Sequence, residues 1–486
     1  MTWFADIVNA MANGKPEFGR GVPVGFDGYL FTVEILMPTT KNSLVDVARV
    51  DEGVVAAYEW YDLTERCRGV QWRRGGDEFG GRPRTGVGTI TLDVDAMGDL
   101  SSWNDSPVSS FEGLGSLLRP GTVIRWGCCS ATTDRANDWL PQFAGIVESW
   151  ETTTVGLRED LYATVTVVET TAALAKIDDN ALPGVVGGND TVFERVARLL
   201  DASRFPYGRI ITYAEAGLPI RLQSTDMANN RLSEMYLTAD SGFVEIRSDQ
   251  RGPLGLYLKP GPRGTIAGAR YPFQERWRSF VRPFFNYVTI SDGQFIEDAV
   301  FDPSTVRWAN DDTAIVNQAT IGIAGQPEHT YSRTDEASVA RYNGLRPFSR
   351  FDLITTGVLS PVVTEQTAEF NLRRSDASRR VEQVTLNHRN TRRYSFGETR
   401  YNAGIVMSID IDTPLHVREI YKTRYSTFRS DGQDVPDLTP PSIWIEARGY
   451  IRALNHRVTP TPTGIDTWEV DIELDTYELI KTEYPQ

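Results

Sequence analysis

The chain has 486 residues, 40% of them apolar and 10% aromatic, so it should form roughly two to four folded domains rather than a disordered chain. Its formal net charge of −15 argues against a protein that holds a nucleic-acid backbone through Lys and Arg. Three cysteines cannot build a disulfide framework, and no apolar run approaches the roughly 20 residues of a membrane helix. The N-terminal stretch lacks the basic-then-apolar order of a secretory signal, so we expect folding in a cytoplasm.

Strand signals dominate the first part of the chain. Runs rich in β-branched and aromatic residues, bounded by Gly, Pro, Asp or Asn, lie at 29–38, 54–63, 122–129, 143–155 and 160–171. Short strands separated by turn residues are typical of an all-β barrel or sandwich. We therefore predict an N-terminal arm and first strand over 1–53 and a first β-barrel over 54–178.

A glycine-rich basic segment, WRRGGDEFGGRPR, spans residues 72–84. Its repeated glycines are typical of a mobile loop. Trp72, Arg73 and Arg74 would then either contact an acidic partner surface or lie in a solvated hairpin tip, and the sequence leaves both interpretations open.

The stretch GTITLDVDAMGDLSSWN, residues 88–104, has acidic residues spaced like part of a calcium loop. An EF-hand loop needs oxygen ligands at positions one, three, five and twelve. With Asp93 at position one, Met97 falls at five and Asn104 at twelve, so two ligands are missing. The alternation before Asp93 is typical of a half-buried strand. We predict that the stretch contains the end of a strand, with neither a metal nor a cofactor.

Helical periodicity begins at DTVFERVARLLDAS, with Asp190 expected as the N-cap. A second helix is predicted in MANNRLSEMYLTADSG, ending at Gly242. These helices indicate an α/β domain over 179–285.

Strand signals return after residue 285, for example at 313–325, and a short helix is predicted within 367–388. We assign a β-rich connecting domain to 286–404 and a second β-barrel to 405–486, to which strands from 286–300 could be added. The predicted fold class is therefore mainly β with an α/β insert, containing two similar β-barrels and a smaller mixed domain.

A long-range echo supports the two barrels. FAGIVES and TVTVVET in residues 118–175 match ARGYIRA and EVDIELD in residues 409–480 in their order and turn pattern. The echo places Gly145 beside Gly449 and Val167 beside Ile472, with Val123 and Val417 on corresponding strands. Two similar barrels in each of three chains would match a sixfold partner. The alternative is that any two antiparallel meanders look alike.

Catalytic motifs are absent from the sequence. The four histidines have no partner at metal-binding or catalytic spacing, and no HExxH, CxxC, GxSxG or phosphate-loop motif occurs. Cys67 has no histidine near it in sequence, and acidic pairs such as Asp410 and Asp412 are expected by chance among 65 acidic residues. The tryptophans are spread along the chain and indicate core or interface positions. We predict that the protein is not an enzyme.

Four phrases, in order, resemble the N-terminal region of minor tail proteins of long-tailed actinobacterial phages. They cover residues 54–178 and comprise Trp60, Asp62 and Thr64; Gly88 to Asp93 with Gly98 to Asn104; Leu118 to Arg125; and Phe143 to Trp150. Val94 and Ser102 depart from the family pattern, in which Asn and Pro are usual. The resemblance implies that residues 88–104 form a barrel strand followed by a tight turn, with the acidic residues satisfying loop backbone rather than a metal.

This resemblance implies a structural virion protein of the tail tip, a baseplate hub that assembles as a trimer in the host cytoplasm and closes the tail tube. The implied partners are the distal tail protein, the tape measure protein and other minor tail proteins, with DNA only as passing cargo and no membrane span. The acidic charge would suit a channel that DNA passes, or ordinary solubility. The structural or interface candidates are Trp60, Asp62, Trp72, Arg73, Arg74, Asp93, Trp103, Gly145, Trp150 and Gly449.

Three alternatives stay open from the sequence. A hexameric distal tail protein would carry the same N-terminal resemblance. A tail-associated cell-wall hydrolase and a glycan-binding receptor module belong to other functional classes.

Overall fold

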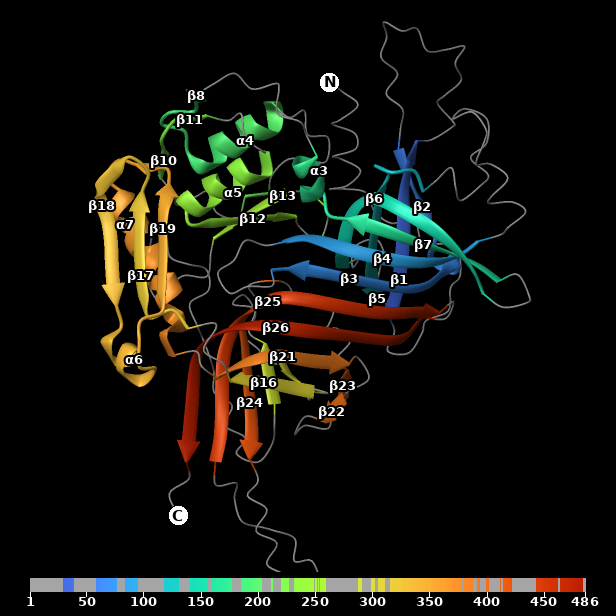
Figure 1. The fold of residues 1–486 in the computed structure, drawn as a ribbon. Helices are drawn as coiled ribbons and strands as arrows, with labels where there is room; N and C mark the ends of the chain where they lie inside the picture. The colour runs from blue at the N-terminus through green and yellow to red at the C-terminus, as the bar shows by residue number, and fades with distance from the viewer. Residues whose placement is uncertain are drawn as a thin grey trace, which may run out of the picture.

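The computed structural model describes the sheets and helices drawn in colour in Figure 1. The described residues are 29–38, 58–76, 84–94, 118–130, 140–155, 160–176, 185–202, 211–212, 220–226, 231–248, 250, 252, 254–258, 287–290, 299–301, 305–310, 315–376, 379–387, 391–393, 399–401, 411, 414–421, 443–461 and 464–483.

The N-terminal half of a 14-stranded sheet is antiparallel throughout, with the strand order β2-β1-β5-β6-β7-β4-β3. Buried and exposed residues alternate in β3, where buried Val70 and Trp72 flank exposed Gln71, whereas residues 123–128 of β5 and 142–147 of β6 are buried throughout. The bounds are β1 (Tyr29–Pro38), β2 (Tyr58–Asp62), β3 (Cys67–Gly75), β4 (Arg84–Val94), β5 (Val123–Ser130), β6 (Leu140–Val155) and β7 (Asp160–Val168), with the 3-10 turn η3 (Thr64–Arg66) between β2 and β3.

The C-terminal half repeats this topology strand for strand. Its order is β15-β14-β24-β25-β26-β21-β16, again with every pairing antiparallel. In chain order these strands match β1 to β7 one by one. They are β14 (Tyr287–Ile290), β15 (Ala299–Phe301), β16 (Thr305–Asn310), β21 (Arg379–Asn387), β24 (Pro414–Tyr421), β25 (Ile443–Thr461) and β26 (Gly464–Glu483).

A β-bulge fixes the residue equivalence between the halves. The β6–β7 register shifts between Val147 and Ser149, and the β25–β26 register shifts between Ile451 and Ala453, which aligns Gly145 with Gly449. The same shift pairs Val167 with Leu474, so the predicted match of Val167 to Ile472 is wrong by two residues.

Ile472 and Leu474 still point to the same face of β26, because side chains on a strand alternate between its two faces. Val123 and Val417 do lie on the corresponding strands β5 and β24. The counterpart of Val417 in the first half is Trp126. Val417 lies opposite Ala447, Trp126 lies opposite Phe143, and the glycine alignment makes Phe143 equivalent to Ala447.

The two halves are joined edge to edge where β3 pairs with β25, from Val70 opposite Val458 to Gly75 opposite Ala453. Figure 1 shows this joint as the blue β3 lying along the red β25. One hydrophobic core runs through both halves. Closure of either half into a barrel stays a prediction.

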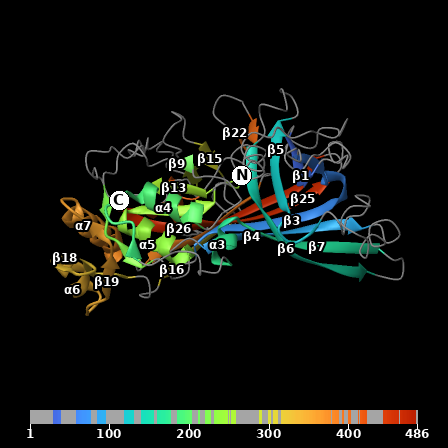
Figure 2. The ribbon, with the colours of Figure 1, turned by 90° about the horizontal axis from the view of Figure 1, so that it is seen from above.

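The helices and short strands of the insert lie beside one end of the main sheet, as Figure 2 shows from above. They enclose a second hydrophobic core. It combines residues between 174 and 256 with residues between 319 and 372, so the region 286–404 contributes to both cores. The five-part domain division stays a prediction. The elements of this part include α3 (Thr171–Ala175), β8 (Val185–Val186), α4 (Val192–Ala202), β9 (Ile211–Thr212), β10 (Arg221–Leu222), β11 (Thr225–Asp226), α5 (Arg231–Ser241), β12 (Val244–Ser248), β13 (Leu254–Leu258), β17 (Gln318–Ile323), β18 (Gln326–Thr334), α6 (Glu336–Arg341), β19 (Pro347–Leu353), β20 (Thr355–Thr356), α7 (Ser360–Leu372) and η5 (Arg373–Asp376). A separate hairpin consists of β22 (Thr391–Arg393) and β23 (Thr399–Tyr401).

The predicted fold class is confirmed: the chain is mainly β and carries an α/β insert. Helix α5 ends at Ser241, directly before the predicted stop at Gly242. The helix expected within 367–388 is misplaced, because α7 begins at Ser360 with Pro361 in its first turn. Residues 379–387 form strand β21 instead.

Candidate functional site

The joint between β3 and β25 brings together several of the predicted interface residues. Trp72 and Arg74, expected in a mobile basic loop, are buried within strand β3, so that part of the prediction is wrong. The alternation of buried and exposed residues continues through Arg74, and the backbone leaves the extended conformation only at Gly75, with φ 95°.

Trp72 lies at the centre of an aromatic cluster that crosses the joint. Its ring stacks on His456 with 4.4 Å between centroids, and the Trp126 and Trp468 rings lie at 5.8 and 6.0 Å. The Trp468 indole nitrogen donates a hydrogen bond to His456 Nδ1 at 3.1 Å. Burial, with a smaller effect from the charge of Arg74, lowers the pKa of His456 to about 3. His456 is therefore a neutral core residue at physiological pH.

Arg74 connects the main sheet to the insert. Its Nε donates to the Glu169 carboxylate at 2.8 Å, and its Nη2 donates to the Ser248 carbonyl oxygen at 2.6 Å. The other Glu169 oxygen accepts from the Gly86 amide at 2.8 Å. A buried guanidinium with these partners fixes the two parts of the molecule against each other.

Arg73 lies on the opposite, exposed face of the joint. It pairs with Glu473 at 3.0 Å, and Arg452 pairs with the same carboxylate at 2.7 Å. Beside them, Gln71 Nε2 donates to Asn455 Oδ1 at 3.4 Å across the two strands. The outer face of the joint is thus bridged by polar side chains.

Three other candidates make local contacts in the N-terminal half. The Trp60 ring lies under the Arg125 guanidinium, 3.6 Å from its central carbon. Asp62 accepts a hydrogen bond of 2.8 Å from the amide two residues later. Asp93, one residue before the end of β4, forms an ion pair with Arg68.

The remaining candidates are two glycines and two tryptophans. Gly145 and Gly449 occupy equivalent positions in β6 and β25. Trp150 is half-buried on β6, beyond the bulge. Trp103 lies outside the described residues, as does the predicted turn after Val94.

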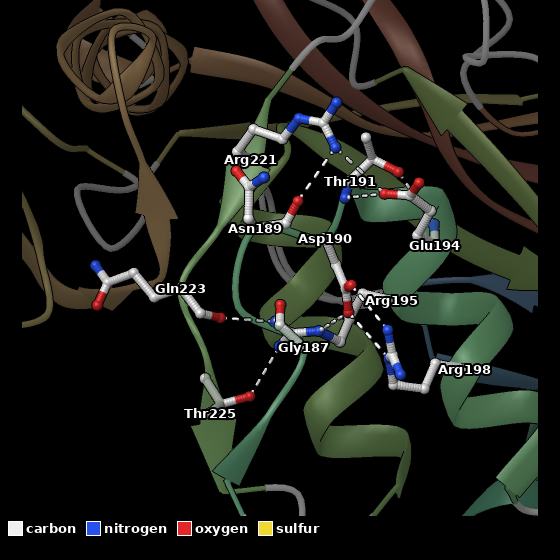
Figure 3. A network of polar contacts seen from close by, with 10 residues as sticks. All are labelled: Gly187, Asn189, Asp190, Thr191, Glu194, Arg195, Arg198, Arg221, Gln223 and Thr225. Carbon is white, nitrogen blue, oxygen red and sulfur yellow. Dashed lines mark hydrogen bonds and ion pairs between the residues drawn. The ribbon is translucent and has the colours of Figure 1, made fainter.

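In the insert, a capping box starts helix α4 (Figure 3). The Thr191 amide donates to Glu194 at 2.7 Å, and the Glu194 amide donates to Thr191 Oγ1 at 3.1 Å. The predicted cap, Asp190, is therefore one residue too early. Its carboxylate binds Arg195 and Arg198, and although burial raises its pKa, hydrogen bonds from both arginines hold that pKa below its ordinary value.

Arg195 has a partner for each guanidinium nitrogen (Figure 3). It donates to Asp190 at 3.2 Å, to Thr225 Oγ1 at 2.8 Å, and to the carbonyl oxygens of Gly187 and Gln223 at 2.5 and 2.6 Å. Burial lowers its pKa, opposed by the hydrogen bond to Asp190. The network ties α4 to the neighbouring strands and has the geometry of a structural cluster.

The described part of the chain offers no group of three or more His, Cys, Asp or Glu residues that could hold a metal ion. Burial raises the pKa of the Cys67 thiol to about 12, so it is not a thiolate near neutral pH. No helix in the described ranges is long and apolar enough to cross a membrane.

Sequence reasoning missed two of the strand equivalences in the duplication, those of β3 with β16 and of β4 with β21. VQW at 70–72 and VRW at 306–308 occupy equivalent places in β3 and β16, and ITLD at 90–93 and VTLN at 384–387 occupy equivalent places in β4 and β21. These short repeats were the available signal. It was hidden because the insert residues 315–376 separate β16 from β21.

No family model matches the sequence, and no curated protein matches it. Among solved structures, the chain is similar to the 43 kDa tail protein of prophage MuSo2 from Shewanella oneidensis, with 12% identity, a TM-score of 0.45, and coverage of 92% of this chain and 98% of that one. It is also similar to a tail protein from Neisseria meningitidis, with 10% identity, a TM-score of 0.43 and coverage of 92% and 97%. A third similarity is to prophage tail protein gp18 from Listeria monocytogenes, with 9% identity, a TM-score of 0.38 and coverage of 91% and 94%.

Proposed function

We propose that this chain is a structural protein of a phage tail tip, a baseplate hub that assembles as a trimer and continues or closes the tail tube. The observation that carries the proposal is the duplicated topology: two halves of one chain have the same strand order and the same bulge. The resemblance of four sequence phrases in 54–178 to phage minor tail proteins supports the same assignment.

The duplication favours a hub over the hexameric distal tail protein. A sixfold tube presents six equivalent surfaces, and a threefold ring can meet all six only by offering two similar units per chain. A distal tail protein with six copies needs one such unit per chain. The second half of this chain therefore has a use in a trimer that it lacks in a hexamer.

In this assignment the chain contacts the distal tail protein, the tape measure protein and other minor tail proteins, at the tail tip of the virion. DNA is only passing cargo. A net charge of −15 would keep a channel wall from binding the DNA backbone.

We also propose that the chain has no enzymatic activity of its own. Cys67, the cysteine considered above as a nucleophile, is buried with a raised pKa, and the buried ion pairs of Arg74 and Arg195 have the partners of structural networks. Clearing in a zymogram with actinobacterial cell wall would contradict this and favour a cell-wall hydrolase. Binding on a glycan array would instead favour a receptor module.

The direct test is imaging of virions produced by the phage or prophage whose genome encodes this chain. We expect density for the chain at the tail tip in three copies. Six copies would favour the distal tail protein, and a virion that lacks the chain would overturn the assignment.

A further inference from the structure

The joint inside the chain shows how one half of the sheet binds the other. The final part of β25, beyond its pairing with β24, lies antiparallel to the outer edge of β3, with His456 opposite Trp72 and Arg457 opposite Gln71. The C-terminal half therefore contributes the extended strand, and the N-terminal half contributes the edge.

An extended strand and a sheet edge of the same kind occur a second time, with the extended strand now in the N-terminal half and the edge in the C-terminal half. By the bulge alignment, the counterpart of the β25 extension is β6 from Ser149 to Val155, and the counterpart of β3 is β16. Beyond Ser149, β6 pairs with β7 on one side, and β16 pairs with β21 on one side. No described strand pairs with the second edge of either. Within the described residues, each is therefore a sheet edge without a strand partner on that side, which is a template for pairing with another strand.

Residues at the internal β3–β25 joint are more deeply buried than their counterparts on β6 and β16, as expected if those two edges lack a partner strand. Leu454, Val70 and Trp72 are 1%, 3% and 0% exposed at the internal joint. Their counterparts, Trp150, Val306 and Trp308, are only partly buried, although all three pack against the same core.

The polar contacts also correspond. At the internal joint, Gln71 Nε2 donates to Asn455 Oδ1, two residues apart diagonally across the strands. The equivalent residues on the open edges are Arg307 for Gln71 and Glu151 for Asn455. Both are exposed, and their charges are opposite. Arg307 already pairs with Glu382 of its own chain at 2.8 Å, and a guanidinium has donors for a second carboxylate.

We propose that β6 of one copy pairs antiparallel with β16 of the next copy, in the register of the internal joint. Thr152 then lies opposite Trp308 and Thr153 opposite Arg307, and Glu151 forms an ion pair with Arg307 of the neighbouring copy. The contact is heterologous, so alternating internal and intermolecular joints generate a ring if the rotation closes. The threefold count rests on the proposed function, whereas the strand pairing rests only on the duplicated halves.

Charge reversal tests the pairing. Sedimentation of the full chain should show an oligomer that Glu151→Arg and Arg307→Glu each weaken by about tenfold or more, because each places like charges together. The double variant Glu151→Arg with Arg307→Glu should recover the wild-type assembly. Glu328→Arg, an exposed charge reversal in the insert, is the matched control and should change nothing.

Cysteine cross-linking tests the register. Thr153→Cys combined with Arg307→Cys places two thiols on directly opposed residues, within the Cα separation that a disulfide requires. Mild oxidation should give a covalent ladder that ends at three chains, while either single substitution should give none. Equal near-ultraviolet circular dichroism of all variants shows that they are folded.

The outcomes separate this inference from the proposed function. The inference is overturned if the wild-type protein stays monomeric. It is also overturned if the Glu151 and Arg307 reversals weaken only the binding of a different protein. An oligomer that ignores the reversals and does not cross-link also overturns it, while a trimeric hub built through another surface survives. A charge-sensitive, cross-linkable oligomer that is absent from the virion supports the inference and defeats the proposed function.

Discussion

Gly145 and Gly449 meet the same obstacle in the two halves of the sheet. A Cβ on Gly145 would lie 2.3 Å from the Val168 carbonyl oxygen, and a Cβ on Gly449 would lie 2.6 Å from the Asp475 carbonyl oxygen. Val168 and Asp475 are themselves equivalent in the bulge alignment. The obstacle in each case is backbone, which cannot move aside like the end of a flexible side chain.

Alanine at either glycine should therefore destabilise the fold by a similar amount. We expect Gly145→Ala and Gly449→Ala each to lower the free energy of unfolding by about 1–3 kcal/mol, the usual cost of overpacking. Urea denaturation measures this. Gly188→Ala is the control, because its nearest atom would be 3.6 Å away, and it should change stability by less than about 0.5 kcal/mol. A large loss at only one of the two glycines would contradict their equivalence.

The match of Gly145 to Gly449 was predictable because glycine is uncommon inside strands, and each of these glycines lies in the first strand of a similar hairpin. The match of Val167 to Ile472 failed because the hairpin is longer in the second half: paired residues Val147 and Val167 are 20 positions apart (167 − 147), whereas Ile451 and Leu474 are 23 apart (474 − 451). The sequence pattern of the strands does not show this difference in hairpin length. The continuation of β3 through Arg74 was missed because a charged residue at a core position reads as a loop until its partner, Glu169, is known.

The buried ion pair between Glu34 and Arg125 gives a second prediction. The two residues lie directly opposite on β1 and β5, with 2.7 Å between Arg125 Nε and Glu34 Oε2, and both side chains are only 2% exposed. Burial lowers the pKa of Arg125, and the charge of Glu34 opposes that shift. Glu34→Leu should cost about 3–5 kcal/mol, because it leaves a buried charge uncompensated.

Replacing both partners should cost less than replacing one. In Glu34→Leu with Arg125→Met, no uncompensated charge is left in the core. Chemical denaturation of both singles and the double variant completes the cycle. A double variant less stable than either single variant would show that these side chains stabilise the fold mainly through packing, such as that of Arg125 on the Trp60 ring, and not through their charges.

The insert network predicts two losses of different size. Arg195→Lys cannot supply the donors that reach Asp190, Thr225 and two carbonyl oxygens, so we expect a loss of about 3 kcal/mol or more. Thr191→Ala removes only one half of the capping box and should cost about 1 kcal/mol. Hydrogen exchange of the α4 amides reports both effects locally, and equal losses would refute the ranking.

Calcium should have no specific effect on stability. Asp93 lies in strand β4, and its carboxylate pairs with Arg68. An ion that bound only the folded state would raise the melting temperature by mass action. We expect the same melting temperature with millimolar calcium as with magnesium. A rise of several degrees with calcium, lost in Asp93→Ala, would show that the segment 93–104 binds the ion.

His456 predicts a dependence of stability on pH. Its ring is enclosed by Trp72 and Trp468, its Nδ1 accepts the Trp468 hydrogen bond, and its pKa is lowered to about 3 by burial. In the unfolded chain the pKa is near 6.5. Between these two values the unfolded state binds a proton that the folded state does not, so acid favours unfolding.

The contribution of His456 should be complete above pH 6.5 and should fall by about 1.4 kcal/mol for each pH unit below it, which amounts to about 2 kcal/mol at pH 5. We expect His456→Gln, which cannot titrate, to lose less stability than the wild type between pH 7 and pH 5 by that amount, even though it is less stable overall. Urea denaturation at several pH values measures both slopes, and carboxylates shared by the two proteins cancel in the difference. Equal slopes for the two proteins would mean that the ring is protonated in the fold, and that the joint between the halves opens to water around it.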